Sequence, residues 1–351
     1  MPTGPVRDAD RLRAGLERWL RGRHAERTGL RVASFERASV GFSNETIVVA
    51  AEWDGPDGGG RERLVVRLPA IEAVHPQPDL GVEAQVQTVL AQAGVPAPAP
   101  AVAERDPNFL GVEFLVMPFV DGRVGPQAPG ADEWLLGLPP SSQRRVAKGF
   151  VELLARVHGV DAGGAGLEAV LRGAGTTIED EIDWWRGYLD WAAGTDPPPP
   201  ILDEMLSWCA AHAPTSEPAA SLLWGDARLG NAILAADGAI VAALDWDMAF
   251  LGPAEHDLGW YLGLDGLTAA LLGQGVPGFP DRDELVSTYE HRLGRGVVDL
   301  EWYEIFALVR SSAVAFRLSV LASATGTATG MPAPEQSPMV PYIRNLMAQA
   351  T

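Results

Sequence analysis

The chain has 351 residues, including 39 glycines, 28 prolines and one cysteine, and its formal net charge is −19. A chain this acidic repels phosphate backbones and anionic headgroups, which argues against nucleic-acid or membrane-surface binding. A single cysteine excludes an intrachain disulfide and fits the reducing cytoplasm, where we expect the protein. The charge leaves two interpretations open: general solubility, or an acidic cleft that attracts a cationic substrate.

The length predicts two domains or lobes. The N-terminal sequence MPTGPVRDADRLRAGL lacks the apolar run of a signal peptide. We expect no transmembrane helix, because no stretch of about 18 uninterrupted apolar residues occurs. The first predicted element is an amphipathic helix over residues 8–23, within an N-terminal helical extension that covers residues 1–30.

Residues 31–120 predict a small antiparallel sheet with one embedded helix, which forms an N-terminal lobe. The apolar period changes here from helical spacing to β-rich runs separated by turn-forming clusters. The predicted helix ends at Gly94, and the prolines that follow prevent it from restarting. The predicted strands cover residues 31–40, 46–53, 64–68, 101–105 and 112–120, and the helix covers residues 81–93.

Residues 121–351 are predicted to form a larger, mainly helical lobe. Residues 221–247 interrupt the helical pattern with an apolar strand, a loop and a short hairpin around the turn at Asp237–Gly238. A strand, loop and hairpin inside a helical lobe indicate a functional segment. The predicted helices cover residues 141–158, 178–192, 201–212, 255–273, 282–294, 300–323 and 339–349.

The segment LLWGDARLGN carries Asp226 and Asn231 five residues apart, and Asp245 follows at the end of a strand. Phosphoryl transfer requires a positioned nucleophile and neutralised phosphate charge. A carboxylate can accept the proton of an acceptor hydroxyl, and Mg²⁺ prefers carboxylate and amide oxygens. This is the D-x-x-x-x-N spacing of kinase catalytic loops, with a later metal-binding aspartate. The pattern predicts Mg²⁺-dependent phosphoryl transfer to a hydroxyl group.

The stretch 221–262 resembles the catalytic core of the aminoglycoside phosphotransferase (APH)/choline kinase-like family. The family wording is H-G-D-x-x-x-x-N, D-W-x-x-A and D-L-A, and LLWGDARLGN, LDWDMAFLGP and HDLGWYL follow the same order here. The resemblance implies an α+β, bilobal protein-kinase-like fold that uses Mg²⁺ and takes ATP as co-substrate. It implies transfer of the γ-phosphate of ATP to a hydroxyl of a small molecule. It implies Asp226 as catalytic base, Asn231 and Asp245 as magnesium ligands, and Asp257 as the buried acid bracing the loop. Asp247 is left open between contact with a metal-bound water and a capping role.

The same resemblance assigns the nucleotide to the N-terminal lobe. Gly41, Ser43 and Asn44 fall in the place of the phosphate-covering loop, although an ordinary hairpin turn uses the same residue types. Arg67 takes the place of the family's strand lysine, and Glu83 matches the helix glutamate that pairs with it. The alternative for these two is a surface ion pair of little consequence.

The segment FLVMPFVDG resembles the hinge between the lobes and assigns Met117, Pro118 and Val120 to the nucleotide site. By that match, the Pro118 carbonyl and the Val120 N–H would face the adenine edge. The alternative is an ordinary edge strand that ends in a turn.

Two substitutions depart from the family pattern. Trp224 stands where the family usually has histidine, and Arg67 replaces lysine. We expect altered loop packing at Trp224 rather than lost chemistry. The departures keep a second function open, a catalytically inactive, pseudokinase-like nucleotide-binding module, although base and both metal ligands are retained together. The sequence does not determine the acceptor, the choice between ATP and GTP, or the oligomeric state.

Two further patterns are less specific. Trp184, Tyr188 and Trp191 fall on one helical face, which is typical of a core stripe and leaves an acceptor wall as the alternative. His158 resembles a structural position of the family, and a role as base or ligand is less favoured because no partner lies nearby in sequence.

Overall fold

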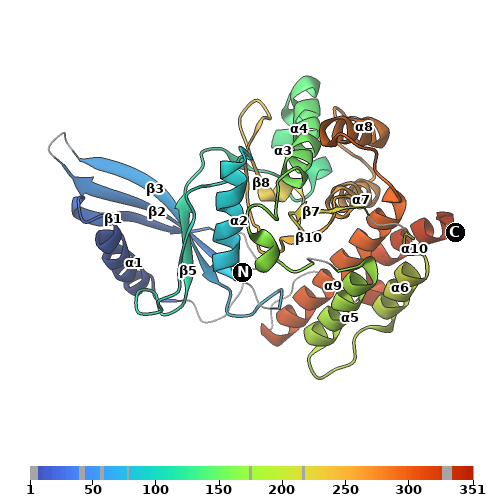
Figure 1. The fold of residues 1–351 in the computed structure, drawn as a ribbon, viewed down its shortest axis with the longest axis horizontal. Coiled ribbons are helices and arrows are strands. Elements are labelled where there is room, and N and C mark those ends of the chain that lie inside the picture. Colours follow the sequence, from blue (N-terminus) through green and yellow to red (C-terminus); the bar gives the residue numbers. More distant parts are fainter. Residues whose placement is uncertain are drawn as a thin grey trace.

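The computed structural model describes residues 7–38, 44–55, 59–76, 79–173, 176–215, 218–325 and 334–350. An antiparallel sheet lobe lies at one end of the molecule and a helical lobe at the other (Figure 1). The predicted α+β, bilobal protein-kinase-like fold is confirmed.

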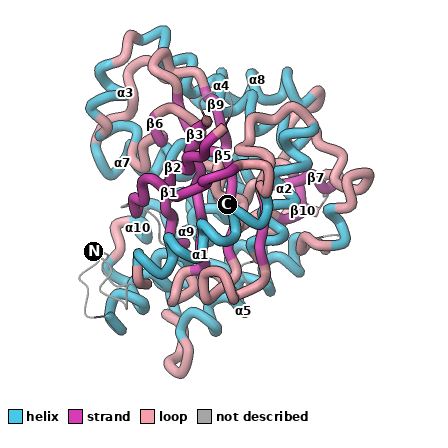
Figure 2. Tube along the Cα trace, turned by 90° about the vertical axis from the view of Figure 1, so that its left-hand side faces the viewer, coloured by secondary structure: helices cyan, strands magenta, loops and turns pink. Residues whose placement is uncertain are grey.

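The N-terminal lobe contains a five-stranded antiparallel sheet in the order β1-β2-β3-β5-β4. The interior strand β5, between β3 and β4, is buried from Phe114 to Met117, which explains why its sequence is a continuous apolar run rather than an alternation. Figure 2 views the molecule from this end, with the strands in front of the helical lobe. The strands are β1 (Thr28–Arg37), β2 (Asn44–Asp54), β3 (Gly60–Pro69), β4 (Val102–Glu104) and β5 (Phe114–Pro118).

Two helices flank this sheet. Helix α1 (Ala9–Arg23) begins at Asp8, whose carboxylate accepts a hydrogen bond from the Arg11 N–H at 2.8 Å. Its buried Leu16 and Trp19 share a hydrophobic core with the sheet. Helix α2 (Leu80–Gln92) faces both lobes, because Leu80 packs on β5 while Leu90 belongs to the core of the helical lobe. The sheet is therefore tied to the larger lobe through α2.

The helical lobe contains every helix that the sequence predicted, with bounds that differ by at most two residues. The five-residue helix α3 was not predicted, because so short a segment shows no apolar period. Helix α9 is long and apolar enough to span a membrane by composition, but half of that window is buried in the lobe. The helices are α3 (Glu133–Gly137), α4 (Pro140–His158), α5 (Ile178–Ala193), α6 (Pro200–Ala211), α7 (Glu255–Leu272), α8 (Arg282–Leu293), α9 (Leu300–Thr325) and α10 (Met339–Gln349).

Short strands within the helical lobe hold the predicted catalytic loop. The hairpin of β8 and β9 agrees with the prediction, and the loop runs from β7 to β8. Two pairings were not predicted: β10 with β7, and β6 with β8, both between segments distant in sequence. The strands are β6 (Arg123–Val124), β7 (Ala220–Leu223), β8 (Ala232–Leu234), β9 (Ile240–Ala243) and β10 (Phe250–Pro253).

Candidate active site

A cavity of about 1090 Å³ lies between the lobes, large enough for a nucleotide together with a second small molecule. Its described lining comes from the sheet, the hinge after β5, the catalytic loop, α7 and α9. Glu83 lies behind the wall, against Arg67. Gly41 and Ser43 lie outside the described residues. The other predicted site residues all line the cavity: Asn44, Arg67, Met117, Pro118, Val120, Asp226, Asn231 and Asp245.

Three side chains orient the carboxylate of Asp226. The Asn231 amide nitrogen donates to Oδ2 at 2.8 Å and also to the Asp226 carbonyl at 2.9 Å. The Arg228 Nε donates to Oδ2 at 2.9 Å, and the Trp260 indole N–H donates to Oδ1 at 3.0 Å. Hydrogen bonds from these donors hold the carboxylate in one orientation. The arrangement suits a group that must receive a proton at a defined position.

Asp257 braces the start of the catalytic loop from the first turn of α7. Its carboxylate accepts hydrogen bonds from the backbone N–H groups of Trp224 at 2.6 Å and Gly225 at 2.9 Å. His158 lies 3.0 Å from the same carboxylate, and all of these groups are buried. A Cβ at Gly225, where φ is +84°, would lie 2.1 Å from the Met248 carbonyl oxygen, so only glycine fits this turn. His158 therefore acts through Asp257 on the loop.

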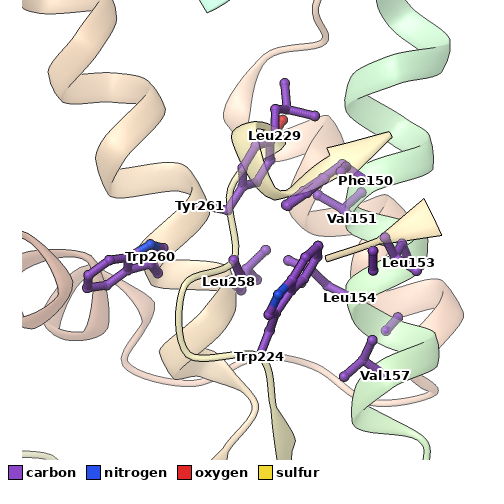
Figure 3. Close-up of a cluster of buried hydrophobic side chains, with 14 of the residues drawn as sticks. Phe150, Val151, Leu153, Leu154, Val157, Trp224, Leu229, Leu258, Trp260 and Tyr261 are labelled. Carbon is purple, nitrogen blue, oxygen red and sulfur yellow. The ribbon is translucent and has the colours of Figure 1, made fainter. Parts of the chain in front are cut away.

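The indole of Trp224 connects the catalytic loop to the strand end that presents Asp245. Its N–H lies 2.9 Å from the Leu244 carbonyl oxygen and 3.2 Å from that of Asp245. The ring stacks on Trp246 with centroids 4.9 Å apart. Figure 3 shows Trp224 between α4 and α7, with Leu154 on one side and Leu258 on the other. One indole donor thus braces the loop where the family usually places a histidine.

We expect Trp224→Phe to lower the free energy of unfolding by about 1–3 kcal/mol, because the ring stack survives while buried carbonyls lose their donor. Urea denaturation measures the difference. Trp184→Phe is the matched control, because Trp184 is only partly buried and its indole N–H makes no hydrogen bond with the described residues. Equal stability of Trp224→Phe and the wild type would show that the indole N–H does not brace the loop.

Arg67 links the two lobes through a chain of ion pairs that is buried at Glu83 and partly exposed at Asp245. Its Nη2 donates to Asp245 Oδ1 at 2.5 Å, and its Nη1 donates to Glu83 Oε1. Arg67 and Glu83 are 6% and 1% exposed, so the alternative of a surface pair does not hold. Burial raises the pKa of Glu83, and the Arg67 guanidinium opposes that rise. Arg67 of β3 in the small lobe therefore contacts Asp245, one of the predicted metal ligands in the helical lobe.

The acids beside Arg67 leave an excess of negative charge suited to a divalent cation. Burial, and then the nearby charge of Asp245, raise the pKa of Asp247 well above its usual range. Asp247 has no hydrogen-bond or ion-pair partner among the described residues, so its side chain does not act as a cap there. Asn231 commits its amide nitrogen to Asp226, which leaves its carbonyl oxygen as a hard ligand. Hence the residues fit a magnesium ion that phosphate and water also coordinate.

The described residues contain no group of three or more His, Cys, Asp or Glu side chains arranged to hold a metal ion. A magnesium site completed by nucleotide phosphates does not require such a group, since this ion keeps several waters and few protein ligands.

The predicted hinge segment crosses between the lobes and lines the cavity with Met117, Pro118 and Val120. The Phe119 N–H donates to the Arg63 carbonyl at 3.0 Å, which keeps the hinge attached to β3. At Gly122, where φ is +149°, a Cβ would lie 2.4 Å from Ile233 Cγ2. Glycine therefore allows the chain to pass directly against β8 as it enters the helical lobe.

The sequence analysis did not identify Arg228 and Trp260, although both contact Asp226. A signal for Trp260 exists, because it lies three residues after Asp257 on α7, one turn along the same helix side. Trp184, Tyr188 and Trp191 do not line the interlobe cavity, and Tyr188 is buried in the core of α5, α6 and α9. The aromatic stripe is therefore mainly core, and the acceptor-wall alternative is not supported within the described part of the chain.

The fold and the cleft define a class: a two-lobed, protein-kinase-like phosphotransferase that acts on small molecules. The chain belongs to the phosphotransferase enzyme family, whose APH family model matches residues 34–297. The family resemblance predicted from the catalytic motif is thereby confirmed.

Solved structures share this fold along nearly the whole chain. A protein from Ralstonia eutropha JMP134, described as an aminoglycoside phosphotransferase, has a TM-score of 0.72 at 23% identity, covering 96% of this chain and 98% of its own. Macrolide 2'-phosphotransferase type I has a TM-score of 0.57 at 17% identity, with 95% of each chain covered. The GDP complex of wild-type aminoglycoside 2'-phosphotransferase-IIIa has a TM-score of 0.52 at 14% identity, with 95% and 97% covered. At these identities the likeness concerns the fold alone.

Curated relatives at the sequence level are much longer proteins. The human acyl-CoA dehydrogenase family member 11 is 26% identical over 309 residues, which are 86% of this chain and 37% of that protein. The Gallus gallus protein of the same name is 32% identical over 217 residues, 59% of this chain and 27% of that protein. This chain thus spans about a third of their length.

Proposed function

We propose that the protein transfers the γ-phosphate of ATP to a hydroxyl of a small molecule in a magnesium-dependent reaction, with Asp226 as the catalytic base. The observation that carries this proposal is the convergence of Asp226, Asn231 and Asp245 on one cavity between two lobes. Asn231 contacts both of the other segments. Its side-chain amide donates to Asp226, and its backbone carbonyl accepts a hydrogen bond from the Leu244 N–H, next to Asp245, at 2.8 Å.

In this reaction Asp226 orients the acceptor hydroxyl and takes its proton on the carboxylate. Asn231 and Trp260 keep the carboxylate in place, so the acceptor oxygen is held for in-line attack. Arg228 keeps a positive charge beside the base and lines the same cavity, where it can oppose the charge of the transferred group.

Asn231 and Asp245 would hold the magnesium ion, which when bound neutralises phosphate charge. Arg67 would contact the phosphates from the sheet side. Asn44, Met117, Pro118 and Val120 would surround the rest of the nucleotide. A structural neighbour is named as a GDP complex, so GTP is tested beside ATP.

The test is Mg²⁺-dependent ADP formation over a panel of hydroxylated acceptors. Names among the similar proteins set the panel: aminoglycosides, macrolides and, because the longer relatives are named for acyl-CoA, hydroxyacyl-CoA thioesters. We expect ADP and a phosphorylated product with at least one acceptor. Nucleotide binding without ADP formation across the panel would favour the inactive-module alternative.

We expect Mg²⁺ with a non-hydrolysable ATP analogue to raise the melting temperature of the wild type more than that of Asp245→Ala, because a ligand that binds the folded state stabilises it by mass action. The quantity compared is the ligand-induced shift, since loss of the contact with Arg67 also changes the unliganded protein. Glu204→Ala, at an exposed surface pair, is the control. Equal shifts in Asp245→Ala and wild type would argue against Asp245 as a ligand.

A further inference from the structure

The segment 70–76, which leads from β3 toward α2, is held against the helical lobe by two side chains. The Arg317 guanidinium of α9 donates to the Ala73 carbonyl from Nε at 3.1 Å and from Nη2 at 3.0 Å. The Tyr188 hydroxyl of α5 donates to the Val74 carbonyl at 2.8 Å. Two adjacent carbonyl groups of the small lobe are therefore fixed by donors of the helical lobe.

The aromatic stripe of α5 supports both of these donors. Tyr188 supplies one hydroxyl, and its ring lies beside the ring of His75, with centroids 6.0 Å apart. The Arg317 guanidinium lies over the ring of Trp191, 4.4 Å from its centroid. The stripe therefore positions the segment that carries His75, in addition to packing in the core.

His75 is an imidazole that the proposed chemistry does not use. The side chain is partly exposed and lines the interlobe cavity, while its Nδ1 is buried. Within the described parts of the chain the ring has no hydrogen-bond partner. Burial lowers the pKa of His75 to about 4; the charge of Asp245 opposes this shift, and the charges of Arg172 and Arg310 add to it. The ring is therefore neutral at physiological pH and offers one N–H donor and one acceptor nitrogen.

The cavity wall beside this segment carries no charged residue. The charged residues among the described lining residues come from the sheet, the catalytic segment and, with Asp265, from α7, and none comes from α9 or from the segment 70–76. An ionic ligand group placed against this wall would be desolvated without a counter-charge, which is costly. An uncharged polar group would be matched by the neutral ring. The face of α9 that lines the cavity has the i, i+3, i+4, i+7 spacing of one helix side and consists of Ser311, Val314, Ala315 and Leu318.

We propose that His75 is a specificity-determining residue that hydrogen-bonds an uncharged polar group of the acceptor, whose remaining body is apolar. This rests on the proposed function, because it places the transferring hydroxyl of the same molecule at Asp226. Arg317 and Tyr188 are positioning residues, which act on the acceptor through His75. The acceptor class is a neutral amphiphilic hydroxy compound rather than a polycation or an anion.

The test uses a series of ω-hydroxyamides of increasing chain length, each compared with the 1-alkanol, the ω-hydroxy acid and the ω-amino alcohol of the same length. An amide both donates and accepts, so it suits either tautomer of His75, and the range of lengths covers the distance between the two sites. Dissociation constants are measured by ligand-observed NMR on the full chain with Mg²⁺ and a non-hydrolysable ATP analogue. We expect the best-fitting amide to bind at least about fivefold more tightly than the matching alkanol, as for a neutral hydrogen bond, and more tightly than either ionic probe.

Two kinds of variant assign this amide preference, which is the ratio of the alkanol and amide dissociation constants. His75→Phe keeps a ring beside Tyr188 but cannot hydrogen-bond, so it should abolish the preference and leave alkanol binding unchanged. His291→Phe, at an exposed histidine of α8 outside the cavity, is the matched control and should keep the preference. Arg317→Met and Tyr188→Phe each remove a contact that fixes the segment, and each should lower the preference, which a merely less stable fold would not do.

The inference is overturned if no amide of the series binds the wild type more tightly than its alkanol, if the preference persists in His75→Phe, or if an ionic probe binds most tightly. An unchanged preference in both Arg317→Met and Tyr188→Phe would remove these two as positioning residues. Each of these outcomes leaves the phosphotransferase proposal intact, because that proposal is tested by ADP formation. Conversely, a preference that depends on His75 in a protein that never forms ADP would place the failure in the proposed function.

Discussion

Replacing Asp226 with asparagine should lower kcat for phosphate transfer by about 10²–10⁴-fold, the range typical of losing a general base. Asparagine has nearly the same shape and keeps one oxygen that can accept the Trp260 indole N–H, but it cannot take a proton from the acceptor. Nucleotide affinity should change little, because the proposed phosphate contacts come from other residues. The measurement is steady-state ADP formation with separate kcat and KM values, since loss of a transition-state interaction lowers kcat at constant substrate binding.

The control for this change is Asp237→Asn in the exposed turn of the β8–β9 hairpin, where Asp237 pairs with Arg145. This substitution should leave kcat unchanged. Full activity in Asp226→Asn would remove Asp226 as the base. Loss of nucleotide binding together with kcat would indicate instead that Asp226 holds the loop together.

Removing the Arg67 side chain should lower the free energy of unfolding by about 3–5 kcal/mol, because it leaves the buried carboxylate of Glu83 without its cation. Arg67→Ala, measured by denaturant unfolding, tests this. The loss of unfolding free energy in Arg67→Ala should become smaller as pH falls. Burial already raises the pKa of Glu83, and without Arg67 the Glu83 carboxylate is protonated at a higher pH in the folded state than in the unfolded state. Protonated Glu83 is then buried without charge.

A double variant separates stability from nucleotide binding. Arg67→Met with Glu83→Leu replaces the pair by apolar groups of similar volume, and such replacements are often neutral or stabilising. We expect stability to recover while the thermal shift with Mg²⁺ and nucleotide stays low, because no cation faces the phosphates. Arg67→Lys should retain part of both properties, since an ammonium cannot reproduce the planar fork that reaches Glu83 and Asp245 together.

For a control, Arg344→Ala breaks the exposed pair with Glu204 and should change stability by less than about 1 kcal/mol. If Arg67→Ala lowers the free energy of unfolding by no more than Arg344→Ala does, the buried pair contributes no more to stability than a surface pair. Recovery of nucleotide binding in the double variant would exclude Arg67 from the phosphate site.

Much of the fold could be predicted because it depends on local patterns. The apolar period placed the long helices within two residues of their observed ends, and the β-rich runs placed the sheet strands. The hairpin of β8 and β9 followed from its turn residues. The pairing of β10 with β7, and the two-residue strand β6, depended on partners distant in sequence, and no local period indicates them.

The order and spacing of residues within 221–262 indicated the family and the candidate base and metal ligands. Chain spacing can do this because Asp226 and Asn231 share one short loop, so a few backbone angles set their separation. The family resemblance also made Arg67 and Glu83 a candidate pair.

Only the tertiary structure decided which distant groups share an environment. Arg67 and Asp245 are 178 residues apart and form an ion pair across the lobes. The indole of Trp224 supports the strand end at Asp245, and Asp265 lies on the wall of the cavity that Asp226 lines. Burial and pKa depend on every neighbour packed around a group, and those neighbours come from the whole chain, so residue type and spacing could not supply them.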